Sequence, residues 1–230
     1  MKYPGDELEI FDKATIWRKY IHFKTKKYFK NKFLEIGAGI GSFTENYEST
    51  FSEISISDLD EKNNKILQKK FKDYKNINIT KKKITDIEGT FNTIIYLNVL
   101  EHIKEDKNEI REAEKKLNDG GYLVILVPAH QKLYSNFDKA VGHHKRYDKD
   151  FFKKNIFENL KMEKLIFLDF FGYFLYFFNN LFFKRDIYPS KFKIMVWDKI
   201  FTPLTIIADF CLGYRVGKNI LCVYKKNKNL

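Results

Sequence analysis

The sequence predicts an α/β fold in which a mostly parallel, doubly wound sheet carries helices on both faces. Short apolar runs alternate with lysine-rich amphipathic runs between residues 30 and 160, which is the pattern of such a sheet. A glycine-rich turn follows the first apolar run, where such folds bind ligands. The chain has 230 residues, of which 44% are hydrophobic and 17% aromatic, so it can bury a substantial core and is not disordered.

The first half of the chain is expected to contain four strands. Residues 7–30 are predicted to form one helix, because Ile10, Ala14, Trp17 and Ile21 recur near a 3.6-residue period. Strands are expected at 32–36, 54–57, 76–80 and 91–97. Helices are expected to begin within 42–47, to cover 61–71, and to follow the fourth strand as far as Leu117.

The second half departs from simple alternation. A turn is expected at 119–121 and a fifth strand at 122–127, ended by Pro128. A helix at 151–160, a strand at about 164–170 and a last strand at 220–224 are expected to follow. There is no repeat and no Pro/Gly/Ser-rich linker, so one domain over 1–230 with an insertion before its last strand is the simplest organisation.

The charge of the chain argues against nucleic acid as the main partner. The net charge is +12, but only five of the 42 basic residues are Arg, the residue that planar phosphate and base recognition favours. An anionic membrane surface or an acidic substrate remains open. Two cysteines, Cys211 and Cys222, make no disulfide framework. The first residues lack an apolar signal core, so we expect a cytoplasmic protein, with membrane association open.

Glycines alternate after the first predicted strand, in the order Glu35-x-Gly37-x-Gly39-x-Gly41. Glycine permits a tight turn with positive φ and lets a ligand approach the backbone closely. The spacing differs from the G-x-G-x-x-G turn that binds a pyrophosphate. An acid two residues upstream suits a ligand that carries a cationic ammonium group.

Three further polar residues follow predicted strands or precede them. Asp58 ends the second strand and could accept both ribose hydroxyls of a nucleoside, although Asp60 competes for this role and a helix N-cap is the alternative. Asp86 could accept a hydrogen bond from an adenine amino group, or could be a solvated loop acid. Asn98 follows the fourth strand and could face a ligand or cap a helix.

Four segments carry a family resemblance: FLEIGAGIGSFT, SDLD, FNTIIYLNVLEHI and LNDGGYLVILVP. In order and spacing they resemble the cofactor half of class I S-adenosylmethionine-dependent methyltransferases, above all the branch related to ubiquinone and menaquinone methyltransferases. The resemblance implies a Rossmann-like, seven-stranded sheet with an antiparallel last strand and a helical, aromatic-rich insertion before it. It divides the domain into an N-terminal helical segment (1–30), a cofactor-binding core (31–160) and an insertion or lid (171–218).

The resemblance also implies roles for residues in the matching segments. S-adenosylmethionine would be the cofactor, with the glycines around its methionine and ribose, Glu35 near the ammonium, Asp58 on the ribose and Asp86 by the adenine. The candidate cofactor-binding residues are Glu35, Gly37, Ala38, Gly39, Gly41, Asp58, Leu59, Asp86, Ile87, Asn98 and Val99. The second strand, Ser55-Ile56-Ser57, is more polar than in the family, which leaves the choice between Asp58 and Asp60 open.

Three of the five histidines, His130, His143 and His144, lie close together after the fifth strand. The segment resembles a subgroup with P-A-H-x-x-L-Y and D…G-H-x-R-R-Y stretches, whose members are often encoded near, or fused to, glycosyltransferases of cell-envelope pathways; here Lys145 replaces the first Arg. An imidazole could act as a base and Arg146 could grip an anionic group. The candidate catalytic residues are His130, His143, Arg146 and Tyr147. The alternative is a loop that these residues merely hold together, and no metal site is predicted.

Residues 170–183 are almost entirely aromatic or Leu. As a helix they would be roughly 21 Å long, short of the roughly 30 Å needed to span a bilayer. A lid over the core and a lipid or membrane contact through 170–185 are both consistent with this composition. The expected function is methyl transfer to a small-molecule or lipid- or glycan-linked acceptor. An RNA or protein methyltransferase, or a non-catalytic cofactor-binding subunit, are the alternatives.

Overall fold

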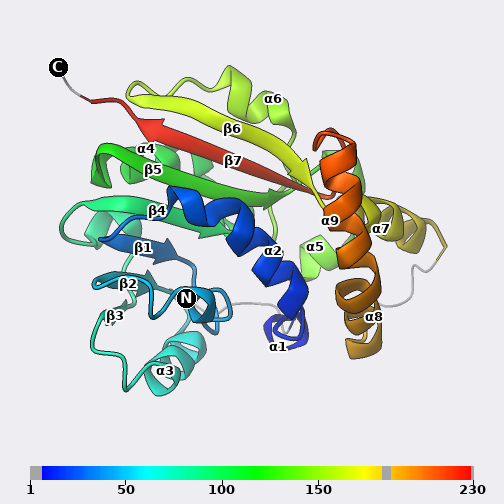
Figure 1. The fold of residues 1–230 in the computed structure, drawn as a ribbon, viewed down its shortest axis with the longest axis horizontal. Coiled ribbons are helices and arrows are strands. Elements are labelled where there is room, and N and C mark those ends of the chain that lie inside the picture. Colours follow the sequence, from blue (N-terminus) through cyan, green and yellow to red (C-terminus); the bar gives the residue numbers. More distant parts are fainter. Residues whose placement is uncertain (1–6, 183–187, 229–230) are drawn as a thin grey trace.

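The computed structural model describes residues 7–182 and 188–228, which form one seven-stranded sheet between two layers of helices (Figure 1). The strand order is β3-β2-β1-β4-β5-β7-β6. The strands are β1 (Phe33–Ile36), β2 (Ile54–Ser57), β3 (Ile77–Thr80), β4 (Phe91–Leu97), β5 (Leu117–Pro128), β6 (Leu160–Leu168) and β7 (Asn219–Lys226). Neighbours from β3 to β5 pair in parallel, and β7 is antiparallel to both β5 and β6. The predicted fold class is therefore confirmed, including the antiparallel last strand.

The sheet separates two hydrophobic clusters, because successive strand side chains point to opposite faces. In β4, Ile94 and Tyr96 belong to one cluster, whereas Ile95 and Leu97 belong to the other. Helix α4 (Asp106–Lys116) and helix α6 (Lys149–Lys154) pack on the first face. Helices α2 (Thr15–Thr25) and α3 (Glu61–Lys70) cover the second.

The N-terminal segment is not the single helix that was predicted. It consists of α1 (Leu8–Phe11), α2 and a 3-10 turn, Lys26–Tyr28. The chain leaves the helical region at Ala14, where ψ is 66°. The carboxylate of Asp198, far away in sequence, accepts hydrogen bonds from the backbone N–H of Trp17 (2.8 Å) and Ile16 (3.2 Å). A distant acid thus caps α2, and no local pattern could have predicted this break.

Two local predictions in the core were wrong. The helix expected after the glycine turn is only a 3-10 turn, Thr44–Asn46, because the short link to β2 is rich in Ser, Thr and Asn, which are weak helix formers. The turn expected at 119–121 lies inside β5 as an irregularity of the ladder, between the pairs Phe91↔Leu117 and Thr93↔Tyr122. Gly120 makes this possible with a φ of 73°.

Other boundaries differ from the prediction. Helix α4 begins only at Asp106, after a 3-10 turn at Leu100–His102. Helix α6 ends at Lys154, and β6 begins at Leu160 rather than near Lys164. Further 3-10 turns lie at Ile84–Asp86 and Gln131–Leu133.

The insertion between β6 and β7 is helical, as predicted. It contains α7 (Phe170–Phe182), α8 (Lys191–Val196), a π-helical turn (Trp197–Phe201) and α9 (Thr202–Cys211), while the short α5 (Asn136–Ala140) precedes α6. These helices lie together beside the carboxyl ends of the parallel strands (Figure 1). Residues 183–185, the end of the aromatic stretch, fall outside the described residues. Among the helices of the described ranges, none has both the length and the apolar character to cross a membrane.

Candidate active site

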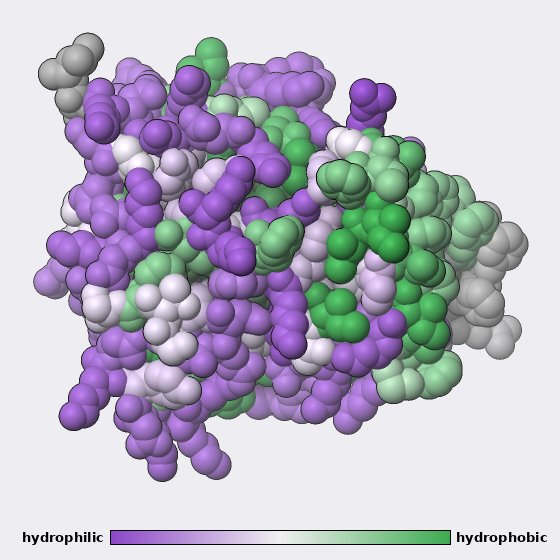
Figure 2. Space-filling model, in the orientation of Figure 1, coloured by the Kyte–Doolittle hydropathy of each residue, from purple (hydrophilic) through white to green (hydrophobic). Residues whose placement is uncertain are grey.

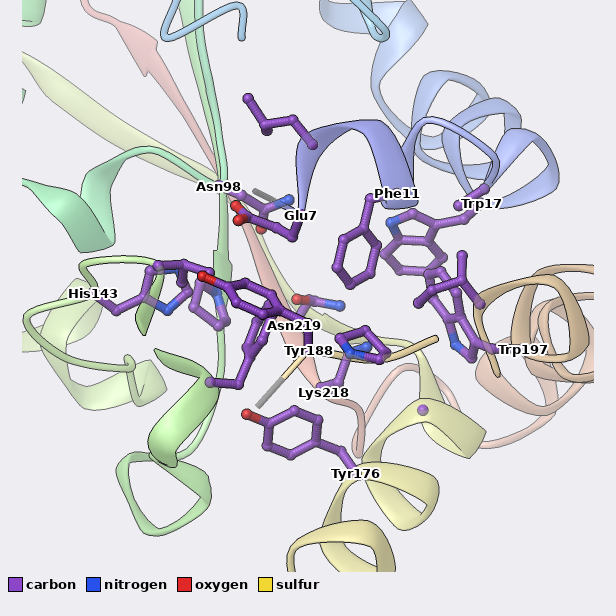
Figure 3. A pocket seen from close by; sticks show the side chains of 18 of the residues that line it. Glu7, Phe11, Trp17, Asn98, His143, Tyr176, Tyr188, Trp197, Lys218 and Asn219 are labelled. Atoms are coloured by element: carbon purple, nitrogen blue, oxygen red, sulfur yellow. The ribbon is translucent and has the colours of Figure 1, made fainter. Parts of the chain in front are cut away.

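A cavity of about 980 Å³ opens at the carboxyl ends of β1, β4 and β5. It runs without interruption from the glycine turn, past the loop after β5, to the helices of the insertion. Figure 3 shows side chains from four parts of the chain around it: Phe11 and Trp17 from the N-terminal helices, His143 from the loop after β5, Tyr176 from α7 and Trp197 from the insertion.

The glycine turn forms one end of this cavity. Gly37, Gly39 and Gly41 have φ values of 69°, 57° and 77°, a region that side chains with Cβ rarely adopt. A Cβ at Gly37 would lie 2.5 Å from Cγ2 of Val99, so the turn packs tightly against the start of the β4–α4 connection. Gly37 and Gly39 line the cavity, and Gly41 instead packs against Phe71.

Glu35 lies beneath the turn, is 2% exposed and lines the cavity. Its Oε2 accepts a hydrogen bond from Oγ1 of Thr44 at 2.7 Å and another from the hydroxyl of Tyr47. Burial raises the pKa of Glu35 to about 7. A cationic group at this end of the cavity would favour the ionised carboxylate.

The two competing acids after β2 have different roles. Asp60 caps α3 by accepting a hydrogen bond from the backbone N–H of Asn63 at 2.9 Å. Asp58 is buried, and its Oδ2 accepts from the backbone N–H of Gly39 at 2.8 Å. Burial raises the pKa of Asp58. The helix-cap role therefore belongs to Asp60, while the carboxylate of Asp58 braces the glycine turn from below.

The remaining candidate cofactor residues divide into two groups. Asn98 and Ala38 line the cavity; Asn98 has a φ of 56°, a left-handed conformation that Asn tolerates better than most residues. Asp86 is exposed in a 3-10 turn and Ile87 is buried in the core, and neither lines the cavity. Leu59 follows Asp58 and is likewise not among the lining residues.

His143, from the loop after β5, also lines the cavity. Its Nδ1 lies 2.8 Å from Oδ1 of the fully buried Asp138, so the proton of the neutral ring belongs on Nδ1. Its Nε2 lies 3.8 Å from Oε1 of Glu101. Burial by itself would raise the pKa of Asp138, but the hydrogen bond from His143 and the charge of Arg146 outweigh it and hold that pKa below its usual range.

Glu101 and His102 complete a cluster with His143. Glu101 is 1% exposed, and neither of its carboxylate oxygens has a hydrogen-bond partner among the described residues. Burial raises the pKa of Glu101 to about 7. One ligand atom from each of Glu101, His102 and His143 lies within 4.8 Å of the others. Carboxylate and imidazole are ligands for a divalent cation, so this cluster is the group in the described residues that could hold one.

Arg146 lines the same end of the cavity, although its charge is already engaged. Its Nε donates to Oδ1 of Asp138 at 2.9 Å, and its guanidinium lies 4.3 Å from the ring centre of Tyr176. It is 5% exposed. Arg146 therefore links the loop after β5 to α7 and holds the acid that orients His143.

Two of the candidate catalytic residues do not line the cavity. His130 stacks on Phe167, and its Nε2 lies 3.0 Å from the carbonyl oxygen of Gly217. The hydroxyl of Tyr147 donates to Oδ2 of Asp106 at 2.7 Å and also lies 3.0 Å from the carbonyl oxygen of Leu100. These contacts fit the alternative interpretation, in which the residues hold the loop in place.

Several residues that line the cavity, and Asp138 behind it, were absent from the sequence-based candidates. Glu101 and His102 had a signal, since they follow the fourth strand directly in the stretch N-V-L-E-H. Asp138 belongs to the D…G-H pattern of the predicted loop. Tyr176 and Trp197 had no signal, because their place on the cavity depends on how the insertion folds back over the sheet.

Helix α1 covers the glycine end. The Leu8 side chain would be 3.6 Å from a Cβ at Gly39. Oδ1 of Asp12 accepts a hydrogen bond from Oγ of Ser42 at 2.5 Å, and the backbone carbonyl of Asp12 accepts one from Arg18 at 2.6 Å. The described N-terminal residues thus form a wall over the turn.

The chain resembles known proteins both in sequence and in fold. A family model described as a methyltransferase domain matches residues 13–159. No curated protein sequence matches the chain at a significant level.

Solved structures share the fold at low sequence identity. The N-methyltransferase NodS from Bradyrhizobium japonicum WM9, in complex with S-adenosyl-L-homocysteine, is 14% identical with a TM-score of 0.57, over 91% of this chain and 85% of that one. An S-adenosylmethionine-dependent methyltransferase from Clostridium acetobutylicum ATCC 824 is 13% identical with a TM-score of 0.61, over 96% and 97%. Coclaurine N-methyltransferase, bound to N-methylheliamine and S-adenosyl-L-homocysteine, is 12% identical with a TM-score of 0.61, over 93% and 72%.

Proposed function

Because the chain belongs to the methyltransferase domain family, we propose that it transfers the methyl group of S-adenosylmethionine to a small-molecule or lipid- or glycan-linked acceptor. The observation that carries this proposal is the continuity of the cavity, which joins the glycine turn to a cluster of acids and histidines. Methyl transfer needs donor and acceptor in line within one enclosed space, and a cavity of about 980 Å³ offers room for both.

The glycine end fits the cofactor. The positive φ of Gly37 and Gly39 leaves the backbone open to close approach, and the buried carboxylate of Glu35 supplies the negative charge that an ammonium group requires. We propose that Asp58 accepts hydrogen bonds from the ribose. The cofactor supplies an electrophilic methyl group and leaves as a neutral thioether, so this end needs no acid.

The His143 end fits the acceptor. We propose that Glu101, His102 and His143 activate the nucleophile. Asp138 positions His143 through a hydrogen bond, and Arg146 balances the charge of Asp138. Tyr176 closes this end from α7. His130 and Tyr147 order the loop and do not touch the acceptor.

The walls favour a compact or lipid-like acceptor over RNA. Phe11, Trp17, Tyr176 and Trp197 surround the cavity and present apolar surface to its contents. The outer part is lined by Leu175, Phe178 and Phe192, which are apolar as well. Lys132, Lys193 and Lys218 line the cavity as well, so it is the apolar character of the walls that favours a compact or lipid-like acceptor.

The experiment is incubation of the purified chain with methyl-labelled S-adenosylmethionine and a fractionated extract. Label should enter a lipid or small-molecule fraction. His143→Ala should abolish the transfer while leaving affinity for S-adenosylhomocysteine and thermal stability nearly unchanged. The neighbouring His144, which is exposed and does not line the cavity, provides the matched control: His144→Ala should transfer normally.

Two outcomes would contradict the proposal. Label in an RNA or protein fraction would establish the alternative methyltransferase classes. Tight S-adenosylhomocysteine binding without label in any fraction would indicate a non-catalytic partner subunit.

A further inference from the structure

At the acceptor end of the cavity, buried hydrogen-bond acceptors face one another. Nδ1–H of His143 donates a hydrogen bond to Asp138, so in the neutral ring the Nε2 lone pair points toward Glu101, 3.8 Å away. Both oxygens of Glu101 are buried without a hydrogen-bond partner among the described residues. Burying a carboxylate in this way costs free energy unless a cation or donor compensates it.

The surroundings of the cluster resemble the outer shell of a metal site. A histidine that binds a metal through one nitrogen usually donates the other N–H to a carboxylate or a backbone carbonyl. Asp138 plays this part for His143, and the backbone of Gly142 hydrogen-bonds to the ring of His102. Both imidazoles are therefore held in fixed orientations beside the carboxylate.

We propose that Glu101, His102 and His143 bind one divalent transition-metal ion, of the zinc or manganese class, at the acceptor end of the cavity. Two imidazoles and one carboxylate are a donor set that such ions accept. Ligands about 2.1 Å from a metal lie roughly 3 to 4 Å apart, and the three ligand atoms here lie within 4.8 Å, so a small convergence of side chains completes the site. Three protein ligands leave coordination positions open toward the cavity.

Binding of the ion is independent of the proposed function, but its role in methyl transfer rests on that function. A hydroxyl bound to a divalent ion loses its proton more easily. The proton passes to water, the oxygen attacks the methyl carbon, and the carbon–sulfur bond breaks as the neutral thioether leaves. This arrangement favours an acceptor with an oxygen nucleophile.

The test measures metal binding directly. The full chain is freed of metal with a chelator and titrated with Zn²⁺ by calorimetry and with Co²⁺ by visible absorption. We expect one equivalent to bind, with the Co²⁺ bands of a site containing histidine. Glu101→Gln and His143→Ala should each weaken Zn²⁺ binding at least tenfold, and His144→Ala should leave it unchanged.

Titration of S-adenosylhomocysteine into the same samples shows whether the variants are folded, and it separates failure of this inference from failure of the proposed function. If the wild type binds S-adenosylhomocysteine and transfers label but takes up no Zn²⁺ or Co²⁺, the metal site is refuted and the proposed function stands. Equal Zn²⁺ affinity in the wild type and both cluster variants would refute it as well.

A second, independent inference comes from the outer face of the insertion, where apolar side chains gather on the surface (Figure 2). On α9, Ile207 and Phe210 are 63% and 74% exposed. The other exposed large apolar residues among the described residues of the insertion are Phe174, Leu175, Phe177, Phe178, Phe192, Met195, Ile200, Leu204, Leu212 and Val216. We call this set the apolar face.

The buried residues of α9 are polar, whereas α8 and the π-helical turn bury Ile194 and Trp197. Thr202, Thr205 and Asp209 of α9 are fully buried. Asp209 accepts hydrogen bonds from the backbone N–H of Asp169 and Phe170 at the start of α7. A helix of a water-soluble protein ordinarily turns its apolar side inward, so α9 is oriented as if its outer side met an apolar medium.

The charges around the apolar face have one sign. Between residues 188 and 218 the chain has two acids, Asp198 and Asp209, and both are fully buried. The same segment contains five basic residues, Lys191, Lys193, Lys199, Arg215 and Lys218, of which Lys199 and Lys218 pair with the buried acids Asp198 and Asp169. Helix α7 contains no charged residue. A second copy of so cationic a face would repel the first, whereas anionic lipid headgroups would attract it.

We infer that the apolar face docks on the surface of an anionic lipid bilayer. Leu175, Phe178 and Phe192 are exposed and also line the cavity, so the cavity opens beside the docked surface. Under the proposed function, a lipid-linked acceptor could enter without leaving the membrane.

Flotation with lipid vesicles tests this inference. The wild type should bind vesicles of phosphatidylcholine and phosphatidylglycerol, and bind those of phosphatidylcholine alone at least tenfold less. Ile207→Asp with Phe210→Asp should remove binding. Phe23→Asp is the matched control, since Phe23 is 64% exposed on α2, outside the apolar face.

Two results would overturn the inference. One is equal flotation of the wild type and the double variant. The other is a dimer in vesicle-free solution, seen by light scattering and removed by the same double variant, which would assign the face to a second copy. Cofactor affinity of the double variant shows that it is folded, so neither result depends on the proposed function.

Discussion

The polarity of α9 leads to an unusual prediction for protein stability. Asp209 accepts hydrogen bonds from two backbone N–H groups and from the hydroxyl of Tyr20, at 3.0, 3.0 and 2.9 Å. Asp209→Ala would leave three donors buried, each costing roughly 1 kcal/mol or more. We therefore expect a loss of about 3 kcal/mol in the free energy of unfolding, which for a chain of this size lowers Tm by roughly 6 to 12 °C.

Urea unfolding at pH 7, followed by circular dichroism, measures this loss. Ile207→Ala on the opposite side of the same helix should change the free energy of unfolding by less than about 0.5 kcal/mol, because its side chain is exposed. In an ordinary amphipathic helix the order of the two effects would be reversed. A larger loss for Ile207→Ala than for Asp209→Ala would refute our account of α9.

The same residue makes stability depend on pH. Burial raises the pKa of Asp209 to about 6, whereas in the unfolded chain it is about 3.9. Between these values the folded protein keeps a proton that the unfolded chain has released, so this contribution to stability is present below pH 4 and lost as pH rises through 6. Asp209→Asn does not titrate. Relative to that variant, the wild type should lose stability between pH 4.5 and 6.5, and a constant difference would contradict the pKa assignment.

Three further predictions concern the cavity and its supports. Gly39→Val should abolish S-adenosylhomocysteine binding, measured by calorimetry. Gly89→Ala, at a positive-φ glycine with no atom near its Cβ position, should lower stability only. If both variants lost affinity equally, backbone strain alone would explain the effect. Asp58→Ala should weaken cofactor affinity at least tenfold, and Asp60→Ala should instead cost about 1 kcal/mol of stability through loss of the α3 cap; the opposite pattern would exchange the two roles. Tyr147→Phe should lower Tm without changing cofactor affinity. If instead Tm were unchanged and turnover were lost, Tyr147 would have a catalytic role.

The parallel core could be predicted from sequence because its signals are local. The bounds of β2 and β4 match the predicted ranges, since β4 is a short, mostly apolar run and β2 alternates Ile with Ser, each between turn residues. The break between α1 and α2 could not be predicted, because Asp198 caps α2 from the far end of the chain. Likewise, the turn residues around Gly120 continue a strand only because β4 pairs with them.

For the candidate site, too, the residues with local signals could be predicted and those that depend on distant contacts could not. The glycine turn and Glu35 lie where their sequence order placed them, because the turn follows β1 directly. The positions of the candidate catalytic residues could be predicted less well. His143 lines the cavity, but Glu101, its partner, comes from the β4–α4 connection, and Tyr147 is turned into the core by Asp106. Which polar residues share a cavity depends on contacts between distant segments, whereas which residues follow a strand does not.

The placement of α1 over the glycine turn has a consequence for the timing of the catalytic cycle. A single helical turn carries Leu8 against Gly39, and the hydrogen bond between Ser42 and Asp12 fastens it. Such a short element opens at far lower cost than the sheet beneath it. Spent cofactor can therefore leave by a local excursion of α1 while the rest of the fold stays intact. The rate at which the thioether product dissociates would then depend on how readily α1 opens.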